Sequence, residues 1–307
     1  MSLTAPPRAW ESRRPLIPEL ALIAATIAYG STFKIVKDAL EHVTPVGFIL
    51  LRFSIGAIVL LPFALRRGWH SREYTEPTRR VDFLQAALLF GVVGFAGYWF
   101  QNAGLQHTST SNSAFITGLF VVFTPLVETI ARRRAPARNV VFAVVLAAVG
   151  LFLLTGAKPT LGKGDALTLG CAACFGVWIY LGGVYSQRFD PIALTTVQMI
   201  VFAVLAIPFV VTGGLGHIDG GVIAAAVITG VLCSAVAFSL QLWGQRYVEP
   251  SRAAVILLFE PVVAGIVGYA VGERLGIHGY LGAVTILAGM VVAEWRVWTS
   301  HGRRVRR

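Results

Sequence analysis

Four charged side chains lie within the long apolar runs of this sequence, and they are the residues best placed to do chemistry. They are Lys34, Arg52, Glu128 and Glu260. Glu128 lies four residues before Arg132 at the end of its run, and we interpret these two residues as a local ion pair. A charge in the apolar zone of a bilayer costs at least ~2.5 kcal/mol on insertion scales, so each requires a function or a partner. Glu260, the deepest carboxylate, could bind the ammonium group of a solute, carry a proton or be neutralised by another segment. The sequence leaves these three roles open.

Aromatic and hydroxyl side chains gather at the centres of two apolar runs. With a rise of ~1.5 Å per residue, Tyr29 and Thr32 reach the midpoint of the first run, and Trp178 reaches that of the sixth. Tryptophan favours membrane interfaces. A tryptophan at mid-depth therefore either lines a cavity or packs between helices, and both alternatives stay open.

Amide side chains form a further polar group. Tyr98, Gln101 and Asn102 lie at positions i, i+3 and i+4 of the third run, on one helical face. Related positions of the eighth run hold Ser234 and Gln241. The two glutamines are interpreted either as rim residues of a cavity or as interhelical hydrogen-bonding groups, worth ~1 kcal/mol or less each. The predicted substrate-binding residues are Tyr29, Thr32, Tyr98, Gln101, Thr117, Trp178, Ser234, Gln241 and Glu260.

An enzymatic alternative rests on Gly162-Lys-Gly-Asp165, which matches the GxGD pattern of intramembrane aspartyl proteases. Aspartyl catalysis needs two carboxylates that share one proton at close range, and the other aspartates lie at the ends of apolar runs. We therefore predict no catalytic residues and keep the protease as a distant alternative. Cys171 and Cys174 have the spacing of half a zinc or redox site, but no second pair accompanies them. We predict packing residues there, no metal and no cofactor.

Ten apolar runs supply the elements that must position these residues. The chain has 307 residues, of which 56% are hydrophobic and 13% charged, whereas a soluble domain has ~25% charged residues. This composition excludes a soluble globule and predicts an all-α membrane protein, because a spanning helix needs ~20 apolar residues. The predicted transmembrane helices are 16–37, 44–66, 82–104, 109–131, 138–157, 164–187, 191–213, 221–246, 251–271 and 278–298.

The basic residues predict how the chain lies in the membrane. A net charge of +11 would suggest nucleic acid in a soluble protein, but here the arginines lie between apolar runs. We predict the lipid bilayer as a partner and no nucleic acid. Apart from Lys34 and Arg52 the chain has 24 Lys and Arg residues, and 20 of them belong to the two termini and alternate gaps when residues at helix ends are counted with the adjoining gap. Because cytoplasmic loops carry the positive excess, we predict a multi-pass protein of the bacterial plasma (inner) membrane with both termini in the cytoplasm.

The two halves of the sequence resemble each other. At an offset of 146 residues, Gly30 matches Gly176, and the match runs through two helices without a gap. We predict one five-helix repeat over 1–157 and a second over 158–307, which the odd number of helices inverts. Inverted repeats can open a central cavity alternately to either side of a membrane. Both halves are joined in one chain, so we expect a monomer.

Short motifs recur in a recognisable order along these helices. They are Tyr29-Gly-Ser-Thr-Phe-Lys34, Thr44-Pro45 with Arg52, Pro125-Leu-Val, Gly164-Asp165-Ala-Leu, Pro261-Val-Val and Gly272-Glu-Arg-Leu275. Together they resemble the drug/metabolite transporter superfamily, and more narrowly its EamA-type ten-span exporters. The resemblance implies ten helices in two inverted repeats, a central substrate cavity, and export of amino acids or similar metabolites.

Charge narrows the class of solute. Phosphate-bearing solutes require several deep cations, whereas Arg52 is the deep one here. Small multidrug exporters of the same superfamily carry a glutamate at the centre of the first helix, whereas Glu19 lies at its end. We therefore predict export of amino acids, aromatic or broadly neutral, with drugs or other metabolites as the alternative. Because Glu260 is the one deep carboxylate, we favour its pairing with Arg52 and export without obligatory proton coupling.

Overall fold

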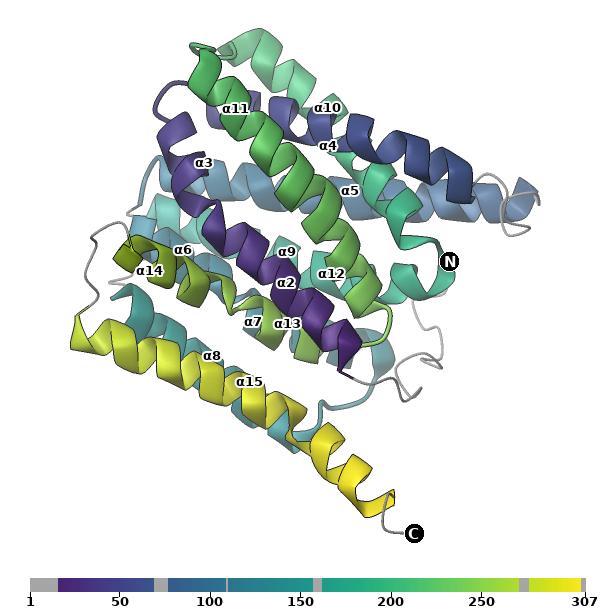
Figure 1. Cartoon of the computed structure of the whole chain (residues 1–307), viewed down its shortest axis with the longest axis vertical. Coiled ribbons are helices and arrows are strands. Elements are labelled where there is room, and N and C mark those ends of the chain that lie inside the picture. Colours follow the sequence, from purple (N-terminus) through teal and green to yellow (C-terminus); the bar gives the residue numbers. More distant parts are fainter. Residues whose placement is uncertain (1–15, 69–76, 109, 157–161, 271–275, 305–307) are drawn as a thin grey trace.

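A computed structural model describes residues 16–68, 77–108, 110–156, 162–270 and 276–304 of the chain. These residues form a bundle of helices (Figure 1), which confirms the predicted all-α fold. The helices are α2 (Ile17–Ser31), α3 (Phe33–Ala39), α4 (Pro45–Gly68), α5 (Pro77–Leu105), α6 (Thr110–Gly118), α7 (Phe120–Arg132), α8 (Arg138–Thr155), α9 (Lys163–Arg188), α10 (Pro191–Gly213), α11 (Gly220–Thr229), a π-helical segment (Gly230–Ala237), α12 (Phe238–Gln245), α13 (Pro250–Leu257), α14 (Glu260–Ala270) and α15 (Ile277–Arg304).

These helices form the predicted membrane-spanning segments in the predicted order, and we number these segments along the chain as crossings. Nine segments of the described chain are long and apolar enough to cross a membrane, and α15 contributes the shorter apolar stretch Ile277–Ala293. Four crossings are not single α-helices. The first is α2 with α3, the fourth α6 with α7, the ninth α13 with α14, and the eighth runs from α11 through the π-helical segment to α12. The sequence analysis did not predict these interruptions.

The bundle has two distinct ends. Helix α2 begins and α15 ends at the same end, on the right of Figure 1. Arg66, Arg132, Arg188 and Arg246 lie at or beside helix termini of this end, which we call the basic end. At the opposite end, the loop between α3 and α4 is hydrogen-bonded to the loop between α10 and α11. There the Thr44 backbone N–H donates to the carbonyl of Leu215 over 2.9 Å.

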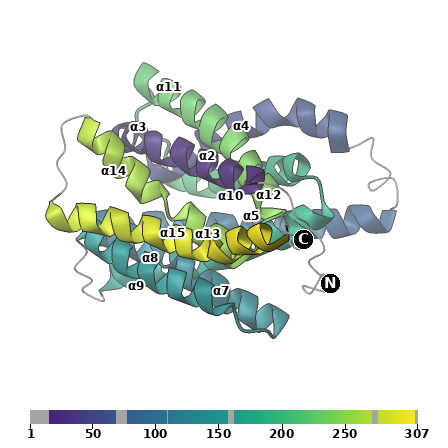
Figure 2. The same ribbon diagram turned by 60° about the horizontal axis from the view of Figure 1, so that its bottom comes forward.

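The packing of the second half repeats that of the first with the partners exchanged. Helix α9, in the sixth crossing, packs against α5, α6 and α7, just as α2, in the first crossing, packs against α12, α13 and α14. Helix α4 packs against its counterpart α10, and α8 packs against α15 at the edge of the bundle (Figure 2). This exchange is what two inverted repeats of five helices produce, because each repeat supplies the same surface to the other.

Some predicted features lie outside the described residues. The predicted boundary between residues 157 and 158 is one of them, and the Gly272-Glu-Arg-Leu275 motif is another. The residues before position 16, which carry the first basic cluster, are also outside. The division into repeats 1–157 and 158–307 therefore stays a prediction.

Single-cysteine labelling should show the basic end in the cytoplasm. We expect a membrane-impermeant thiol reagent added to intact cells to modify cysteine at Gly213 but not at Ala135, because the arginine-rich gaps are retained inside. Both positions are exposed, and a side chain at Gly213 meets no atom within 4 Å. The variants require Cys171, Cys174 and Cys233 replaced by alanine. Labelling of the Ala135→Cys variant but not of the Gly213→Cys variant would show the opposite orientation.

Candidate functional site

The interrupted crossings bring their breaks to the middle of the bundle. In the ninth crossing, Pro261 lacks the N–H that a continuous helix would direct to the carbonyl of Leu257, so the chain restarts as α14 with the proline in its first turn. In the first crossing, α2 ends at Ser31 and the Thr32 hydroxyl donates to the Ala28 carbonyl over 3.0 Å. Discontinuous helices at mid-depth are typical of transporter binding sites.

A cavity of about 400 Å³ lies against these breaks. Its size falls within the range of ~300–1,000 Å³ that is usual for small-molecule sites. Eight of the nine predicted residues line it, namely Tyr29, Thr32, Tyr98, Gln101, Thr117, Trp178, Gln241 and Glu260. The structure thus brings together side chains from both repeats, and their binding of a substrate stays a prediction.

Ser234 is the predicted residue that does not line the cavity. Its side chain is fully buried, and its hydroxyl accepts a hydrogen bond of 2.9 Å from Nε of Arg52. Arg52 itself lines the cavity. The predicted set omitted Arg52, although its unusual depth in the second run was a signal in the sequence. Ser234 therefore lies outside the cavity lining and orients Arg52, which is part of that lining.

The amide and hydroxyl groups of the cavity are hydrogen-bonded to one another across crossings. The Tyr29 hydroxyl donates to Oε1 of Gln241 over 2.9 Å, which joins the first crossing to the eighth. Nε2 of Gln101 donates to the Thr117 hydroxyl over 3.4 Å, which joins the third to the fourth. Both glutamines therefore line the cavity and form interhelical hydrogen bonds, and their role as rim residues stays a prediction.

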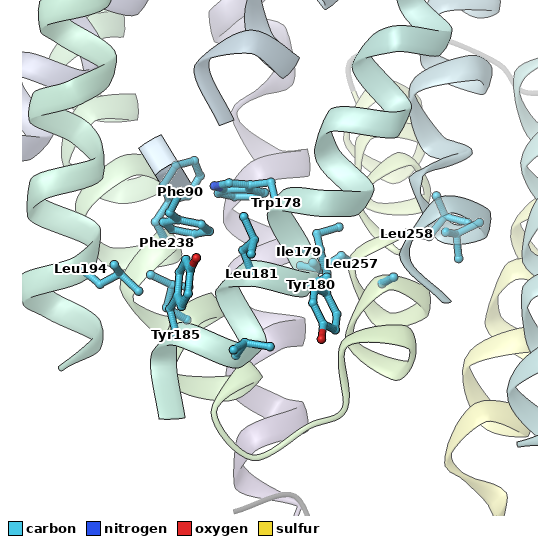
Figure 3. Packing of buried hydrophobic residues seen from close by; sticks show 14 of the residues in the cluster. Phe90, Trp178, Ile179, Tyr180, Leu181, Tyr185, Leu194, Phe238, Leu257 and Leu258 are labelled. Carbon is cyan, nitrogen blue, oxygen red and sulfur yellow. The ribbon is translucent and has the colours of Figure 1, made fainter. Parts of the chain in front are cut away.

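Trp178 both lines the cavity and packs between helices. Its ring is stacked on that of Phe90, with centroids 5.4 Å apart and an interplanar angle of 9°. Its Nε1 donates to Oε1 of Gln198 over 3.3 Å, and Gln198 is fully buried. Figure 3 shows Trp178 next to Phe90 and Phe238. The sequence analysis missed Gln198, because a lone amide in the seventh run does not reveal its partner on the sixth.

Replacing Trp178 with alanine should impair transport and leave the protein folded. The change removes a ring from the cavity wall and the partner of Gln198, and large-to-small changes of this kind cost ~3–5 kcal/mol in buried sites. We expect transport in proteoliposomes to fall at least ~10-fold, while Trp178→Phe, which keeps the stacking on Phe90, retains most of it. Size-exclusion chromatography checks the fold. Full transport by a folded alanine variant would make Trp178 a packing residue only.

Arg52 and Glu260 do not form the ion pair that the sequence favoured. Both line the cavity and lie close enough to interact electrostatically, but no salt bridge joins them. Instead, Nε of Arg52 is held by Ser234, and its guanidinium carbon lies 5.2 Å from the centroid of the Phe53 ring. These contacts hold the guanidinium group against Phe53 on the same helix and Ser234 in the eighth crossing, so Arg52 does not pair with Glu260.

The cavity is closed toward the basic end. The last turns of α9 are buried from Trp178 to Ser186, and Figure 3 shows Leu181 and Tyr185 below Trp178 on this helix. Nε2 of Gln245 donates to the carbonyl of Ile179 over 3.2 Å, which fastens α12 to α9 at this level. In the other direction the cavity lining extends to Leu40 and Pro45, at the opposite end of the bundle.

A network of charged residues fastens the basic end itself. The predicted pair of Glu128 and Arg132 is confirmed, with a separation of 2.6 Å. The Glu128 carboxylate also accepts hydrogen bonds from the hydroxyl and the backbone N–H of Ser251, on α13. In a second link, Arg252 lies 3.2 Å from Glu19 on α2. The first, fourth and ninth crossings are thereby joined where the cavity is closed.

Glu249 precedes α13 at the edge of this network, 3.9 Å from Arg132. Burial and the negative charge of Glu128 raise the pKa of Glu249, and the charges of Arg132 and Arg252 oppose this rise.

The residues of the enzymatic alternative lie away from the cavity. Asp165 lies in the first turn of α9, at the opposite end, and accepts a hydrogen bond from the Thr108 hydroxyl. Among the described residues, no group of three or more His, Cys, Asp or Glu side chains could hold a metal ion. Cys171, Cys174 and Cys233 are free thiols, and Cys171 is buried as a packing residue should be.

Comparison with known proteins identifies relatives over the whole described bundle. A model of the EamA-like transporter family matches residues 16–156 and again residues 162–294. An uncharacterised transporter of Archaeoglobus fulgidus is 34% identical, with 94% of this chain and 89% of the relative covered. The threonine/homoserine exporter RhtA of Salmonella typhimurium is 24% identical, with 84% and 85% covered. A solved crystal structure, 17% identical, has a TM-score of 0.77 over 94% of this chain and 99% of that chain.

Proposed function

Because the chain belongs to the EamA-like transporter family, and is thus a membrane transporter and not an enzyme, we propose that it exports amino acids from a bacterial cell. Export proceeds by alternating access through the central cavity, with both termini in the cytoplasm and the inner membrane as its location. One chain suffices, since both repeats that enclose the cavity are covalently joined.

The observation that carries this proposal is the composition of the cavity wall. Aromatic rings such as Trp178 and Tyr98 suit an apolar side chain, while amides and hydroxyls suit the polar groups of an amino acid. Arg52 and Glu260 are the charged groups among the described lining residues, so the wall is balanced in charge. A solute with no net charge fits it better than a phosphate or a lipophilic cation does.

Two resemblances add support. The relative RhtA is named as a threonine/homoserine exporter, and the order of the motifs along this chain resembles the amino-acid exporter YddG. With the basic end in the cytoplasm, the cavity extends toward the outside, and the closed network around Glu128 is the inner barrier. Exchange of conformations between the inverted repeats would close the outer end and open the inner one.

Purified protein in liposomes provides the test. We expect labelled L-phenylalanine or L-threonine to equilibrate across vesicles that contain the protein, and an imposed pH gradient to cause little acceleration. Vesicles loaded with at most one chain each should retain the flux of a monomer. Accumulation of substrate against its gradient when only a proton gradient is supplied would show obligatory coupling. Absence of flux of both amino acids would favour the second candidate, export of drugs or other metabolites, to which the aromatic wall is also suited.

A further inference from the structure

We propose that Arg52 and Glu260 together select a zwitterionic substrate, with Arg52 binding the substrate carboxylate and Glu260 binding its ammonium group. The assignment rests on the proposed function and deepens it, because it names the groups a substrate must carry. It follows from how each of the two side chains is held in the cavity wall.

The guanidinium group of Arg52 is held in one orientation, yet the side that faces the cavity has no hydrogen-bond partner among the described residues. The bond from Nε to Ser234 and the contact with Phe53 fix the plane of the guanidinium group from behind. Its terminal Nη atoms form no hydrogen bond with any described residue. A guanidinium presents its donors as a planar fork that matches a carboxylate. An arginine that is anchored at Nε and faces a cavity is therefore prepared for a carboxylate ligand.

The position of Glu260 is set by the backbone of the interrupted ninth crossing, not by a hydrogen bond from a described residue to its side chain. It is the first residue of α14, where the break before Pro261 turns the chain, and its half-buried side chain lines the cavity. Its carboxylate accepts no hydrogen bond from any described residue. The amino end of a helix favours a negative charge. Glu260 therefore faces the cavity without a direct cation partner among the described residues, where an ammonium group can reach it.

The separation of the two charges decides which ligand completes the site. Arg52 interacts electrostatically with Glu260 but forms no salt bridge with it, so a ligand that carries an ammonium group and a carboxylate on one carbon atom can lie between them. An amine would leave the arginine uncompensated, and a carboxylic acid would leave the glutamate uncompensated. Such unpaired charges are costly in a desolvated site. The pair therefore selects for both charged groups of an amino acid at once.

The test compares three solutes that share one side chain. Uptake of labelled L-phenylalanine into proteoliposomes is competed with unlabelled L-phenylalanine, 2-phenylethylamine, which lacks the carboxylate, and 3-phenylpropionate, which lacks the ammonium group. In the wild-type protein each analogue should compete at least ~10-fold more weakly than the amino acid. Arg52→Gln should improve the amine relative to the acid by ~10-fold, and Glu260→Gln should do the reverse. A merely structural role would weaken uptake without this reciprocal change.

A matched control removes the same charges outside the cavity. Lys34 and Asp38 form an exposed pair at 3.1 Å, and Lys34→Gln and Asp38→Asn should leave the ratio of the two analogues unchanged. If a cavity variant does not transport, the shift in its thermal midpoint with each solute measures the same ratio in detergent. An unchanged ratio in both cavity variants, or an analogue that competes as well as L-phenylalanine, would overturn the assignment. Absence of wild-type flux of L-phenylalanine and L-threonine would overturn the proposed function itself.

Discussion

Replacing Gly176 with valine should abolish transport and sharply reduce the yield of folded protein. Gly176 lies on α9 where this helix crosses α7, and a Cβ atom there would lie 2.5 Å from Cβ of Phe123 and 3.0 Å from its carbonyl carbon. Backbone atoms cannot move aside as the end of a flexible side chain can. Overpacking of this kind typically costs ~1–3 kcal/mol and occasionally more, and valine adds further methyl groups to the clash.

The equivalent glycine of the first repeat should respond in the same way. A Cβ atom at Gly30 would lie 2.6 Å from Cβ of Val263 and 2.7 Å from the carbonyl oxygen of Glu260, at the break between α13 and α14. Each repeat thus uses a glycine to bring an interrupted crossing against its neighbour. We expect Gly30→Val to lower thermal stability and transport as Gly176→Val does.

A valine at Gly213 supplies the matched control, since nothing lies within 4 Å of a Cβ atom there. Thermal midpoints in detergent and transport rates in liposomes measure the three variants. Gly213→Val should behave as the wild type in both assays. Equal midpoints for Gly176→Val and Gly213→Val would show that α7 and α9 do not need their close approach.

Replacing Glu128 with alanine should shift the protein toward a state with an open basic end. The change removes the acceptor of both Ser251 donors and the closest partner of Arg132. Hydrogen bonds to a charged group contribute ~1.5–3 kcal/mol each. A net loss of ~2 kcal/mol that affects only the closed state would change the ratio of the two states ~30-fold.

The reactivity of a cysteine at Leu181 measures this shift. Leu181 is buried below Trp178 and does not line the cavity, so its thiol should react with a maleimide only when the basic end opens. We expect faster labelling in the Glu128→Ala background, in a chain whose three native cysteines are replaced by alanine. Asp38→Ala, which removes an exposed carboxylate of a surface pair, should leave the rate unchanged. An unchanged rate with Glu128→Ala would mean that the network does not hold this end closed.

The sequence alone determined the crossings, their order and the residues at mid-depth. Apolar length and the rise of a helix are properties of the chain itself, which is why Tyr29, Thr32 and Trp178 could be placed before any contact was known. The local pair of Glu128 and Arg132 was equally accessible, because residues four apart share a helical face. The repeat was visible as well, since Gly30 and Gly176 occupy matching positions.

The tertiary structure decided how these residues are partnered. Arg52 could pair with any deep acceptor, and only the packing of α4 against the π-helical segment brings it to Ser234 rather than to Glu260. Gln198 behind Trp178 and the closure of the basic end depend likewise on contacts between different helices. Depth and periodicity constrain one helix at a time, whereas the rotation of each helix toward its neighbours is set by side-chain packing across the whole bundle.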